Sequence, residues 1–600
     1  MAEKSNEPVG FPDPVKISEA MARIARQSQG MVEKFAAQLG SGDEHAYGSL
    51  NLHDAGKTFQ EMLGQMCLDP SKLAETQMQF WNQYQRLTQQ TLERFLGQEP
   101  EPVMRPESGD KRFKHEDWES SPVFDYIKQT YLLASRYIYD TVEQVEGLDE
   151  KTSQKVDFYT RQFVDALAPS NFVATNPRVL QQTVDTGGEN LLDGLSNLLG
   201  DLEAGQGRLR IRMTDIDKFT LGENVAVTPG KVVYQNELMQ LLQYSPTTDE
   251  VYRVPLLIFP PWINKYYILD LRPENSFIQW AVDQGHSVFV ISWVNPDEKL
   301  SQKDFEDYLL EGPIEALAAI HRATGESEVN AIGYCLGGTL LACTLAYIKA
   351  REHEYGIRSA TFFTTMIDFS DPGELGAFID EEQINTIEEE MEKKGYLDGA
   401  KMAETFNLLR ANDLIWNFVI NNYLMGKDPF PFDLLYWNSD STRMPYAMHS
   451  FYLRNMYQNN LLKTPGGISL NETPIDVSAI DTPAYILATK EDHIAPWTSA
   501  YAATQLYSGP ARFVLGGSGH IAGVINPPSA QKYGYWVGNR LPENPQEWLS
   551  ATDQHDGSWW LDWQDWVAGY AGDKVAARRP GDSGLEVLED APGSYVKTRA

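Results

Sequence analysis

A thiol lies between small residues at a predicted junction of strand and helix, in Gly333-Tyr334-Cys335-Leu336-Gly337-Gly338. The apolar residues 329–333 predict a strand before the thiol, and residues 336–349 predict a helix after it. This is the context of a nucleophile elbow, with cysteine in place of the usual serine. The positive end of the helix dipole favours the thiolate, and an adjacent base would complete its activation. Cys335 is therefore the predicted nucleophile.

The partners of such a nucleophile are expected downstream, with an acid first and a histidine after it. The apolar run 484–488 predicts a strand, and Asp492 comes shortly after its end. A second predicted strand, residues 512–515, leads into a loop rich in Gly and Ser that carries His520. We therefore predict that Cys335, Asp492 and His520 form a catalytic triad.

Acyl transfer also requires hydrogen-bond donors for the oxyanion that develops in the transition state. The amide of Leu336, the residue after the nucleophile, is expected to be one donor, and the loop after an earlier strand is expected to supply the other. Residues 255–259 predict that strand, and Pro260-Pro261-Trp262-Ile263-Asn264 follows it. We predict that the Ile263 amide is the second donor. A simple turn made by the two prolines would have the same sequence.

From about residue 225 onward, short apolar segments alternate with helix-like segments, which is typical of a parallel α/β sheet. The predicted strands are residues 232–234, 239–244, 255–259, 287–293, 329–333, 359–364, 484–488 and 512–515. Together with the order of nucleophile, acid and histidine, this alternation predicts an α/β-hydrolase fold. Between residues 367 and 462 the strand signals disappear. We predict that this aromatic, Asn-rich insertion forms a cap over the site.

Residues 1–210 are predicted to form an all-helical N-terminal domain, and residues 211–600 a catalytic domain that includes the cap. Between Leu73 and Leu96, apolar side chains recur at spacings of three to four residues in most places, which predicts a helix with one face in need of a partner. The residues of this stripe are Met78, Trp81, Tyr84, Leu87 and Phe95. The cluster from Trp559 to Tyr570 predicts a second helix that faces the core.

Charge and cysteine content exclude several classes of protein. The chain has 50 Lys and Arg against 84 Asp and Glu, a net charge of −34, which disfavours nucleic acid as a partner. Cys67, Cys335 and Cys343 have no C-x-x-C spacing, so we expect neither a disulfide framework nor a metal site. Apolar runs fall short of the roughly 18–20 residues of a membrane span, and the opening residues lack a secretory pattern. We expect a cytoplasmic protein.

Several stretches of the sequence resemble the polyhydroxyalkanoate synthases, bacterial enzymes that polymerise 3-hydroxyacyl-coenzyme A thioesters into a storage polyester. The matching stretches include PPWINKYYILDLRPENSF, GYCLGGTL, FDLLYWNSDSTRMP and LGGSGHIAGVINPP. The resemblance implies that Cys335 is the nucleophile, His520 the base and Asp492 the third member. It further implies that Trp437 is an aromatic residue near the catalytic face of the cap, and that Arg410 contacts coenzyme A.

The resemblance also implies how the enzyme works and with what it associates. Cys335 would take the 3-hydroxyacyl group from coenzyme A, and the 3-hydroxyl of the next substrate would attack the bound acyl group. Coenzyme A is part of the substrate, so no separate cofactor is implied. The chain length resembles the self-sufficient class I type, which prefers short-chain monomers such as 3-hydroxybutyryl-coenzyme A, and the medium-chain class II type is the alternative. The resemblance also implies a homodimer, with the cap as part of the contact. The apolar helix faces of residues 1–210 must be buried against something, so we expect this region to hold the dimer or the nascent polyester at the granule surface, with simple packing on the catalytic core as the alternative.

Two other functions fit the same motifs. A cysteine-nucleophile thioesterase or acyltransferase of this fold would use water or another acceptor, but it would not need a helical N-terminal domain of this size. A non-catalytic scaffold that binds granules is disfavoured because all three catalytic residue types are present in order. Coenzyme A release from 3-hydroxybutyryl-coenzyme A, followed by analysis for polymer, free acid or no product, separates the three functions.

Overall fold

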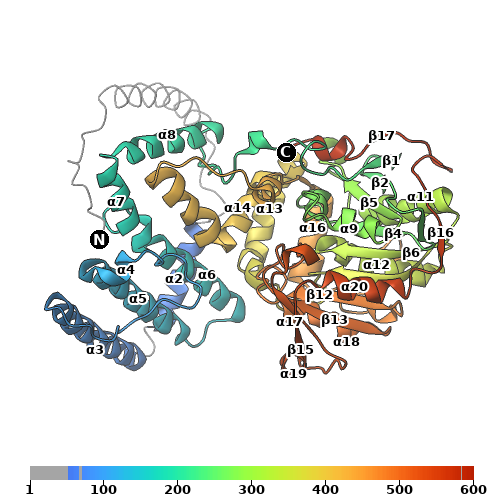
Figure 1. Cartoon of the computed structure of the whole chain (residues 1–600). Coiled ribbons are helices and arrows are strands. Elements are labelled where there is room, and N and C mark those ends of the chain that lie inside the picture. The colour runs from blue at the N-terminus through green and yellow to red at the C-terminus, as the bar shows by residue number, and fades with distance from the viewer. Residues whose placement is uncertain (1–51, 67–69, 583) are drawn as a thin grey trace. The chain divides into compact units, whose positions relative to one another are not determined.

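The computed structural model describes residues 52–66, 70–582 and 584–600, and the chain divides into two compact units (Figure 1). The first, called the helical unit below, consists of the described residues up to Asp215 together with Glu404–Pro431. The second, called the sheet unit, consists of Ile216–Ala403 and Phe432–Ala600. Cys67 lies outside the described residues. No helix in the described part of the chain is long and apolar enough to cross a bilayer.

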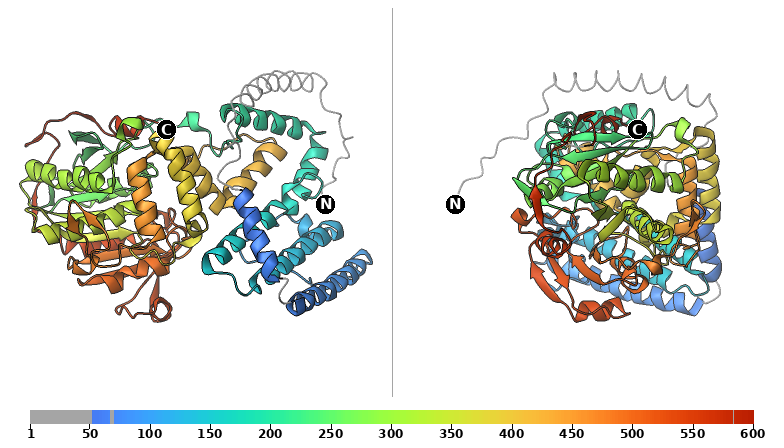
Figure 2. Two further views of the ribbon diagram at one scale, coloured as in Figure 1. Left: turned by 180° about the vertical axis from the view of Figure 1, so that it is seen from behind. Right: turned by 90° about the vertical axis from the view of Figure 1, so that its right-hand side faces the viewer.

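The sheet unit, seen from two further sides in Figure 2, is built on one eleven-stranded sheet. In sheet order the strands are β15 (Asp553–Asp556), β14 (Gly534–Val537), β13 (Ala511–Gly516), β12 (Ala484–Thr489), β7 (Gly356–Phe363), β6 (Glu328–Tyr334), β4 (Leu256–Phe259), β5 (Val288–Trp293), β2 (Met239–Tyr244), β1 (Gly230–Gln235) and β17 (Glu589–Asp590). The six strands from β13 to β5 run parallel, and the outer strands pair antiparallel on both sides. All eight predicted strands are confirmed.

Both faces of the sheet are covered, which explains why the central strands are apolar at almost every position. Along β4, Leu257 and Phe259 join one core cluster, while Leu256 and Ile258 join the other, as the two-residue period of a strand requires. The first cluster includes α10 (Phe305–Leu309), α11 (Glu315–Thr324) and α12 (Leu336–Arg351), and the second includes α9 (Phe277–Asp283) and α20 (Trp560–Ala568). This is the predicted α/β-hydrolase fold, and the predicted core-facing helix near the C-terminus is confirmed as α20.

The predicted cap, residues 367–462, is divided between the two units. Its elements in the sheet unit are α13 (Glu381–Lys394), β8 (Tyr396–Leu397), α15 (Asp433–Asn438), β9 (Met444–Pro445), α16 (Tyr446–Tyr452) and the π-helix η9 (Leu453–Gln458). Glu404–Pro431 belongs to the helical unit and carries most of α14 (Gly399–Leu409), together with the π-helices η7 (Asn412–Trp416) and η8 (Val419–Leu424).

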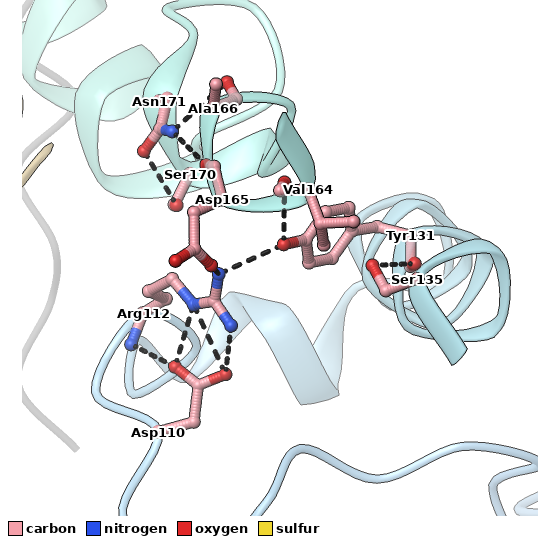
Figure 3. A network of polar contacts seen from close by, with 9 residues as sticks. All are labelled: Asp110, Arg112, Tyr131, Ser135, Val164, Asp165, Ala166, Ser170 and Asn171. Atoms are coloured by element: carbon pink, nitrogen blue, oxygen red, sulfur yellow. Dashed lines mark hydrogen bonds and ion pairs between the residues drawn. The ribbon is translucent and has the colours of Figure 1, made fainter. Parts of the chain in front are cut away.

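Among the described residues, the helical unit has seven further α-helices, which are α2 (Leu52–Met66), α3 (Pro70–Phe95), α4 (Asp117–Ser120), α5 (Pro122–Glu143), α6 (Glu150–Ala166), α7 (Pro177–Asp185) and α8 (Glu189–Ala204). A polar network around Arg112 connects three of its segments (Figure 3). The Arg112 guanidinium donates to Asp110 before α4, to Tyr131 on α5 and to Asp165 on α6, with each donor–acceptor distance 3.0 Å. The Tyr131 hydroxyl in turn donates to the Val164 carbonyl at 3.1 Å.

The predicted single apolar stripe on α3 is only partly right. Leu87 is fully buried, whereas Met78 and Trp81 are 66% and 52% exposed. A spacing of three residues turns a helix by 300°, so each step drifts by 60°, and Met78 and Leu87 lie on opposite sides. Leu92 and Phe95 are also exposed, at 61% and 60%. One side of α3 therefore packs within the helical unit, and another side presents apolar groups to solvent.

Glu404–Pro431 joins the helical unit through close backbone contact with α8. The Tyr423 hydroxyl donates to Asp201 at 2.7 Å, and the Asn190 side-chain amide donates to the Leu424 carbonyl at 2.7 Å. Gly194 faces the same segment, and a Cβ atom added there would lie 1.8 Å from the Tyr423 carbonyl oxygen. The absence of a side chain at Gly194 is what allows this approach.

We predict that Gly194→Ala detaches the segment from α8. Alanine inside a helix is otherwise favoured over glycine by about 0.5–1 kcal/mol, but the collision with the Tyr423 backbone should reverse the sign and destabilise the helical unit by about 1–3 kcal/mol. Hydrogen exchange of residues 419–424 should become faster. The control is Gly64→Ala on α2, where a Cβ meets no atom within 4 Å. Equal stabilisation by both substitutions would contradict the prediction.

Candidate active site

Cys335 occupies a strained turn between β6 and α12. Its backbone has φ 53° and ψ −118°, a conformation that costs free energy in a residue with a side chain. Hydrogen bonds hold it there: the Cys335 amide donates to the Phe363 carbonyl at 2.9 Å, and the Cys335 carbonyl accepts from Gly338 at 2.9 Å and Thr339 at 3.1 Å. The thiol is thus presented at the N-terminus of a helix at the carboxyl edge of the sheet, as the sequence predicted.

Three glycines make this turn possible because they let backbones approach closely. A Cβ on Gly337 would lie 2.0 Å from the Phe259 carbonyl oxygen at the end of β4. On Gly338 it would lie 1.9 Å from the Thr365 hydroxyl, and on Gly333 it would lie 2.5 Å from the Gly338 Cα. The start of α12 is therefore packed directly against the end of β4, next to the loop that carries Ile263.

Asp492 and His520 meet as predicted, on the loops after β12 and β13. The His520 Nδ1 atom lies 2.6 Å from Asp492 Oδ2, and the two side chains are 10% and 0% exposed. The other carboxylate oxygen, Oδ1, accepts the amides of Ile494 and Ala495 at 2.9 Å each. These bonds fix the carboxylate, which in turn orients the imidazole and leaves Nε2 for a further partner.

Cys335 is close enough for its charge to act on this imidazole. Burial disfavours the charged imidazolium, but the charges of Asp492 and of the Cys335 thiolate, and the hydrogen bond to Asp492, raise the pKa of His520 to about 10. The structure therefore brings Cys335, His520 and Asp492 together in the order nucleophile, base and acid. An arrangement of this kind can remove the thiol proton and hold it close to the reacting atoms.

The two predicted oxyanion donors both have unused amides. In the described part of the chain, neither the Leu336 amide nor the Ile263 amide donates to a protein acceptor. Leu336 opens α12, where the first amides of a helix lack intrahelical partners. Ile263 packs against the apolar cluster that also receives Cys335. Donation from these amides to a substrate oxyanion stays a prediction.

The two predicted substrate-binding residues belong to different units. Trp437 on α15 is only 5% exposed, and its indole Nε1 donates to the Lys265 carbonyl at 2.7 Å, so it packs within the sheet unit. Arg410 belongs to the helical unit, where its guanidinium pairs with Asp413 at 2.6 Å and stays 43% exposed. Their contact with substrate stays a prediction.

Two cap tyrosines near the nucleophile were missed by sequence analysis. Tyr452 on α16 donates to the Thr339 hydroxyl at 3.2 Å, and Thr339 donates to the Met366 carbonyl at 3.1 Å. Burial and then, among further causes, the charge of Cys335 raise the pKa of Tyr452 and of Tyr457 on η9. Their aromatic spacing looks like ordinary helix packing, so the sequence held no signal for this placement.

Across residues 52–66, 70–582 and 584–600, no group of three or more His, Cys, Asp or Glu is arranged to hold a metal ion.

Comparison with known proteins gives matches along nearly the whole chain. A family described as poly-beta-hydroxybutyrate polymerase (PhaC) N-terminus matches residues 109–281, and one described as alpha/beta hydrolase fold matches residues 255–527. The chain is 48% identical to a poly(3-hydroxyalkanoate) polymerase of Methylorubrum extorquens, over 97% of this chain and 96% of the relative. Poly(3-hydroxyalkanoate) polymerase subunits PhaC from Rhizobium meliloti (strain 1021) and Cupriavidus necator are 48% and 44% identical, covering 100% and 82% of this chain and 97% and 83% of their own.

We predict that Asp492→Asn lowers the reactivity of Cys335 in a defined pH window. Histidine ordinarily loses its proton near pH 6.5, whereas His520 keeps it to about pH 10, so its positive charge stabilises the thiolate between these values. Without the Asp492 charge the pKa of His520 falls, and alkylation by iodoacetamide should slow by about tenfold or more at pH 7–8. Above about pH 10 the two rates should converge. Equal rates at every pH would contradict the assignment.

Proposed function

Because this chain belongs to the family of poly(3-hydroxyalkanoate) polymerases, we propose that it transfers 3-hydroxyacyl groups from coenzyme A to Cys335 and joins them into a polyester. The observation that carries this proposal is the thiol on its strained turn, close to a histidine whose Nδ1 atom lies 2.6 Å from a buried carboxylate. Family membership supplies the reaction class, a transferase, and the site supplies the groups that such a reaction needs.

In the first half of the proposed reaction, His520 takes the proton of Cys335, and the thiolate attacks the thioester carbonyl carbon. The carbonyl oxygen becomes an oxyanion, which the amides of Leu336 and Ile263 would stabilise. The bond to the coenzyme A sulfur then breaks, and that sulfur leaves with the proton held on His520. The enzyme keeps a 3-hydroxyacyl thioester on Cys335.

In the second half, the 3-hydroxyl of the next substrate attacks the acyl carbon on Cys335. His520 would accept the hydroxyl proton and return it to the Cys335 sulfur as that bond breaks. Asp492 would either orient His520 or help to activate the hydroxyl. A thiol suits this cycle because an enzyme thioester exchanges with an incoming thioester at little cost in free energy, whereas a serine would form a more stable oxygen ester.

We propose the class I type of substrate, with 3-hydroxybutyryl-coenzyme A as the monomer, on the basis of chain length. Arg410, with its partly exposed guanidinium, is proposed to contact the phosphates of coenzyme A. Trp437 is proposed to border the site through its bond to the Lys265 carbonyl next to the Ile263 loop.

The decisive test compares the two described thiols. Cys335→Ala should abolish coenzyme A release from 3-hydroxybutyryl-coenzyme A while the fold persists. Cys343→Ala should retain most activity, because Cys343 is fully buried in α12 and burial raises the pKa of its thiol, so it stays protonated and unreactive. The product should be polymer. Free acid would indicate a thioesterase, and no product in the wild type would indicate a non-catalytic scaffold.

We further propose that the helical unit supports a homodimer and holds the protein on the polyester granule. The supporting observation is the exposed apolar surface of Met78, Trp81, Leu92 and Phe95 on α3 and of Leu96 directly after it. Patches of this kind mark sites that bind other apolar surfaces.

The granule role predicts that Trp81→Gln combined with Leu92→Gln lowers the granule-bound fraction several-fold in sedimentation, because both apolar groups would become polar. Coenzyme A release in solution should be unchanged. The control is Leu167→Gln, since Leu167 is 51% exposed at the end of α6 but lies outside the α3 patch. Equal binding of the double variant and the control would count against the α3 surface.

A further inference from the structure

A buried ion pair begins two residues after Ile263 in the loop that follows β4, and the steps proposed above do not use it. Lys265 Nζ lies 2.7 Å from Asp440 Oδ1, and the two side chains are 3% and 1% exposed. The other oxygen of Asp440 accepts the Tyr267 hydroxyl at 2.9 Å. The pair therefore connects the loop after β4 to the segment that follows α15.

Around this pair, the two segments are joined along their backbones. Asn264 and Ser441 form an isolated antiparallel bridge. The Thr442 amide donates to the Ile263 carbonyl at 2.9 Å, and the Trp437 indole donates to the Lys265 carbonyl at 2.7 Å. Three successive loop residues are thereby fixed against residues 437–442.

Thr442 controls the orientation of the peptide group between Trp262 and Ile263. Its hydroxyl donates to the Trp262 carbonyl, which belongs to the same peptide group as the Ile263 amide. A trans peptide is planar, and its C=O and N–H point in opposite directions. Holding the Trp262 carbonyl therefore sets the direction of the Ile263 N–H. Thr442 also holds the next carbonyl, so it restrains the peptide groups on both sides of Ile263.

The other end of the loop is fixed by the elbow itself. A Cβ on Gly337 would collide with the carbonyl oxygen of Phe259 and come within 2.9 Å of the Pro260 carbonyl carbon, so the loop begins in contact with α12. The Ile263 amide thus lies between two anchors, the start of α12 and the segment around Asp440.

The electrostatics of the Lys265–Asp440 pair indicates that it fixes the geometry of the loop more than it stabilises the fold. Burial lowers the pKa of Lys265 even though Asp440 opposes this shift, so the pair sits where charge is disfavoured. Replacing both members of a buried ion pair with apolar residues is often neutral or stabilising. The pair nevertheless has a specific geometry, and removing only one of its two members leaves an uncompensated buried charge. A positional role accounts for charges in such a place.

We propose that Lys265, Asp440 and Thr442 are positioning residues, which hold the Ile263 amide where the oxyanion forms during acylation of Cys335. The inference rests on the proposed function for its chemical step. It assigns the base of the cap, residues 437–442, a part in catalysis through the loop after β4, without contact between these residues and substrate.

The test uses the full chain and three changes: Thr442→Val, Thr442→Ser and the double variant Lys265→Met with Asp440→Leu. Valine removes the hydroxyl donor and keeps the backbone amide, whereas serine restores the donor. The double variant removes both charges together, so no single buried charge is left behind. The matched control is Arg578→Met. It breaks another ion pair of the sheet unit, in which the Arg578 guanidinium lies 2.7 Å from the Glu326 carboxylate. Glu326 comes just before β6, at the opposite end of that strand from Cys335.

Two reactions of Cys335 are then compared. Acylation forms an oxyanion and requires its donors, but alkylation by iodoacetamide is a simple displacement and forms none. Thr442→Val and the double variant should slow acylation and kcat by about 10- to 100-fold, with KM within about twofold of wild type. Alkylation should stay within about twofold of wild type in every variant. Thr442→Ser and the control should acylate at rates close to wild type.

Two results would overturn the inference: a parallel fall of acylation and alkylation, or wild-type acylation by the double variant and Thr442→Val. Acylation is measured with both 3-hydroxybutyryl-coenzyme A and the activated ester p-nitrophenyl acetate, followed by mass spectrometry of Cys335. Should the wild type accept the activated ester but form no polymer, the proposed function fails. The comparison of variants on the ester would still decide whether the positioning residues act on the oxyanion.

Discussion

The close approach of α12 to the end of β4 is the constraint on which the rest of the site depends. The Gly337 backbone lies where a side chain would overlap the Phe259 carbonyl, and this contact sets the distance between the thiol and the Ile263 loop. Cys335 accepts a strained backbone as a consequence, and its bonds to Phe363 and Gly338 hold the strain in place. A nucleophile and its oxyanion donors must be held to within about 0.5 Å of the productive geometry, and the backbone contact at Gly337 restrains this distance.

Two buried charge pairs surround this contact, and their partners differ. Asp492 uses one oxygen for His520 and the other for two backbone amides, so both oxygens of the buried carboxylate have hydrogen-bond partners. Asp440 is bound by a lysine and a tyrosine, and burial and the charge of Asp440 raise the pKa of Tyr267 well above its usual value, so the tyrosine keeps its proton. The first pair is suited to proton transfer, and the second to holding a fixed geometry.

The sequence predicted the parts of the fold and site that follow from local patterns. The eight strands are short apolar runs between turn signals, and Cys335, Asp492 and His520 each follow a strand at the same sheet edge, so their meeting follows from topology. Lys265 and Asp440 are 175 residues apart and sit in segments with no periodic signal, so their pairing depends on tertiary contact. The prediction of a single apolar stripe on α3 was only partly right, because residues spaced by three positions drift around a helix. The division of the cap could not be predicted because Glu404–Pro431 joins the helical unit through tertiary contacts, among them the close approach at Gly194, which have no signal in the local sequence pattern.

The inclusion of Glu404–Pro431 in the helical unit links this unit to the predicted cap. Glu404–Pro431 leaves the sheet unit after Ala403 and returns at Phe432, directly before α15 and the segment that holds Asp440. Its docking on α8 uses backbone carbonyls of Asn422 and Leu424 and the buried carboxylate of Asp201, groups that need partners once water is excluded. The helical unit therefore supplies hydrogen-bond partners to part of the cap, and it cannot be treated as an independent domain that ends at residue 210. Any role of the helical unit at the granule surface therefore also involves Glu404–Pro431, the part of the predicted cap that belongs to this unit.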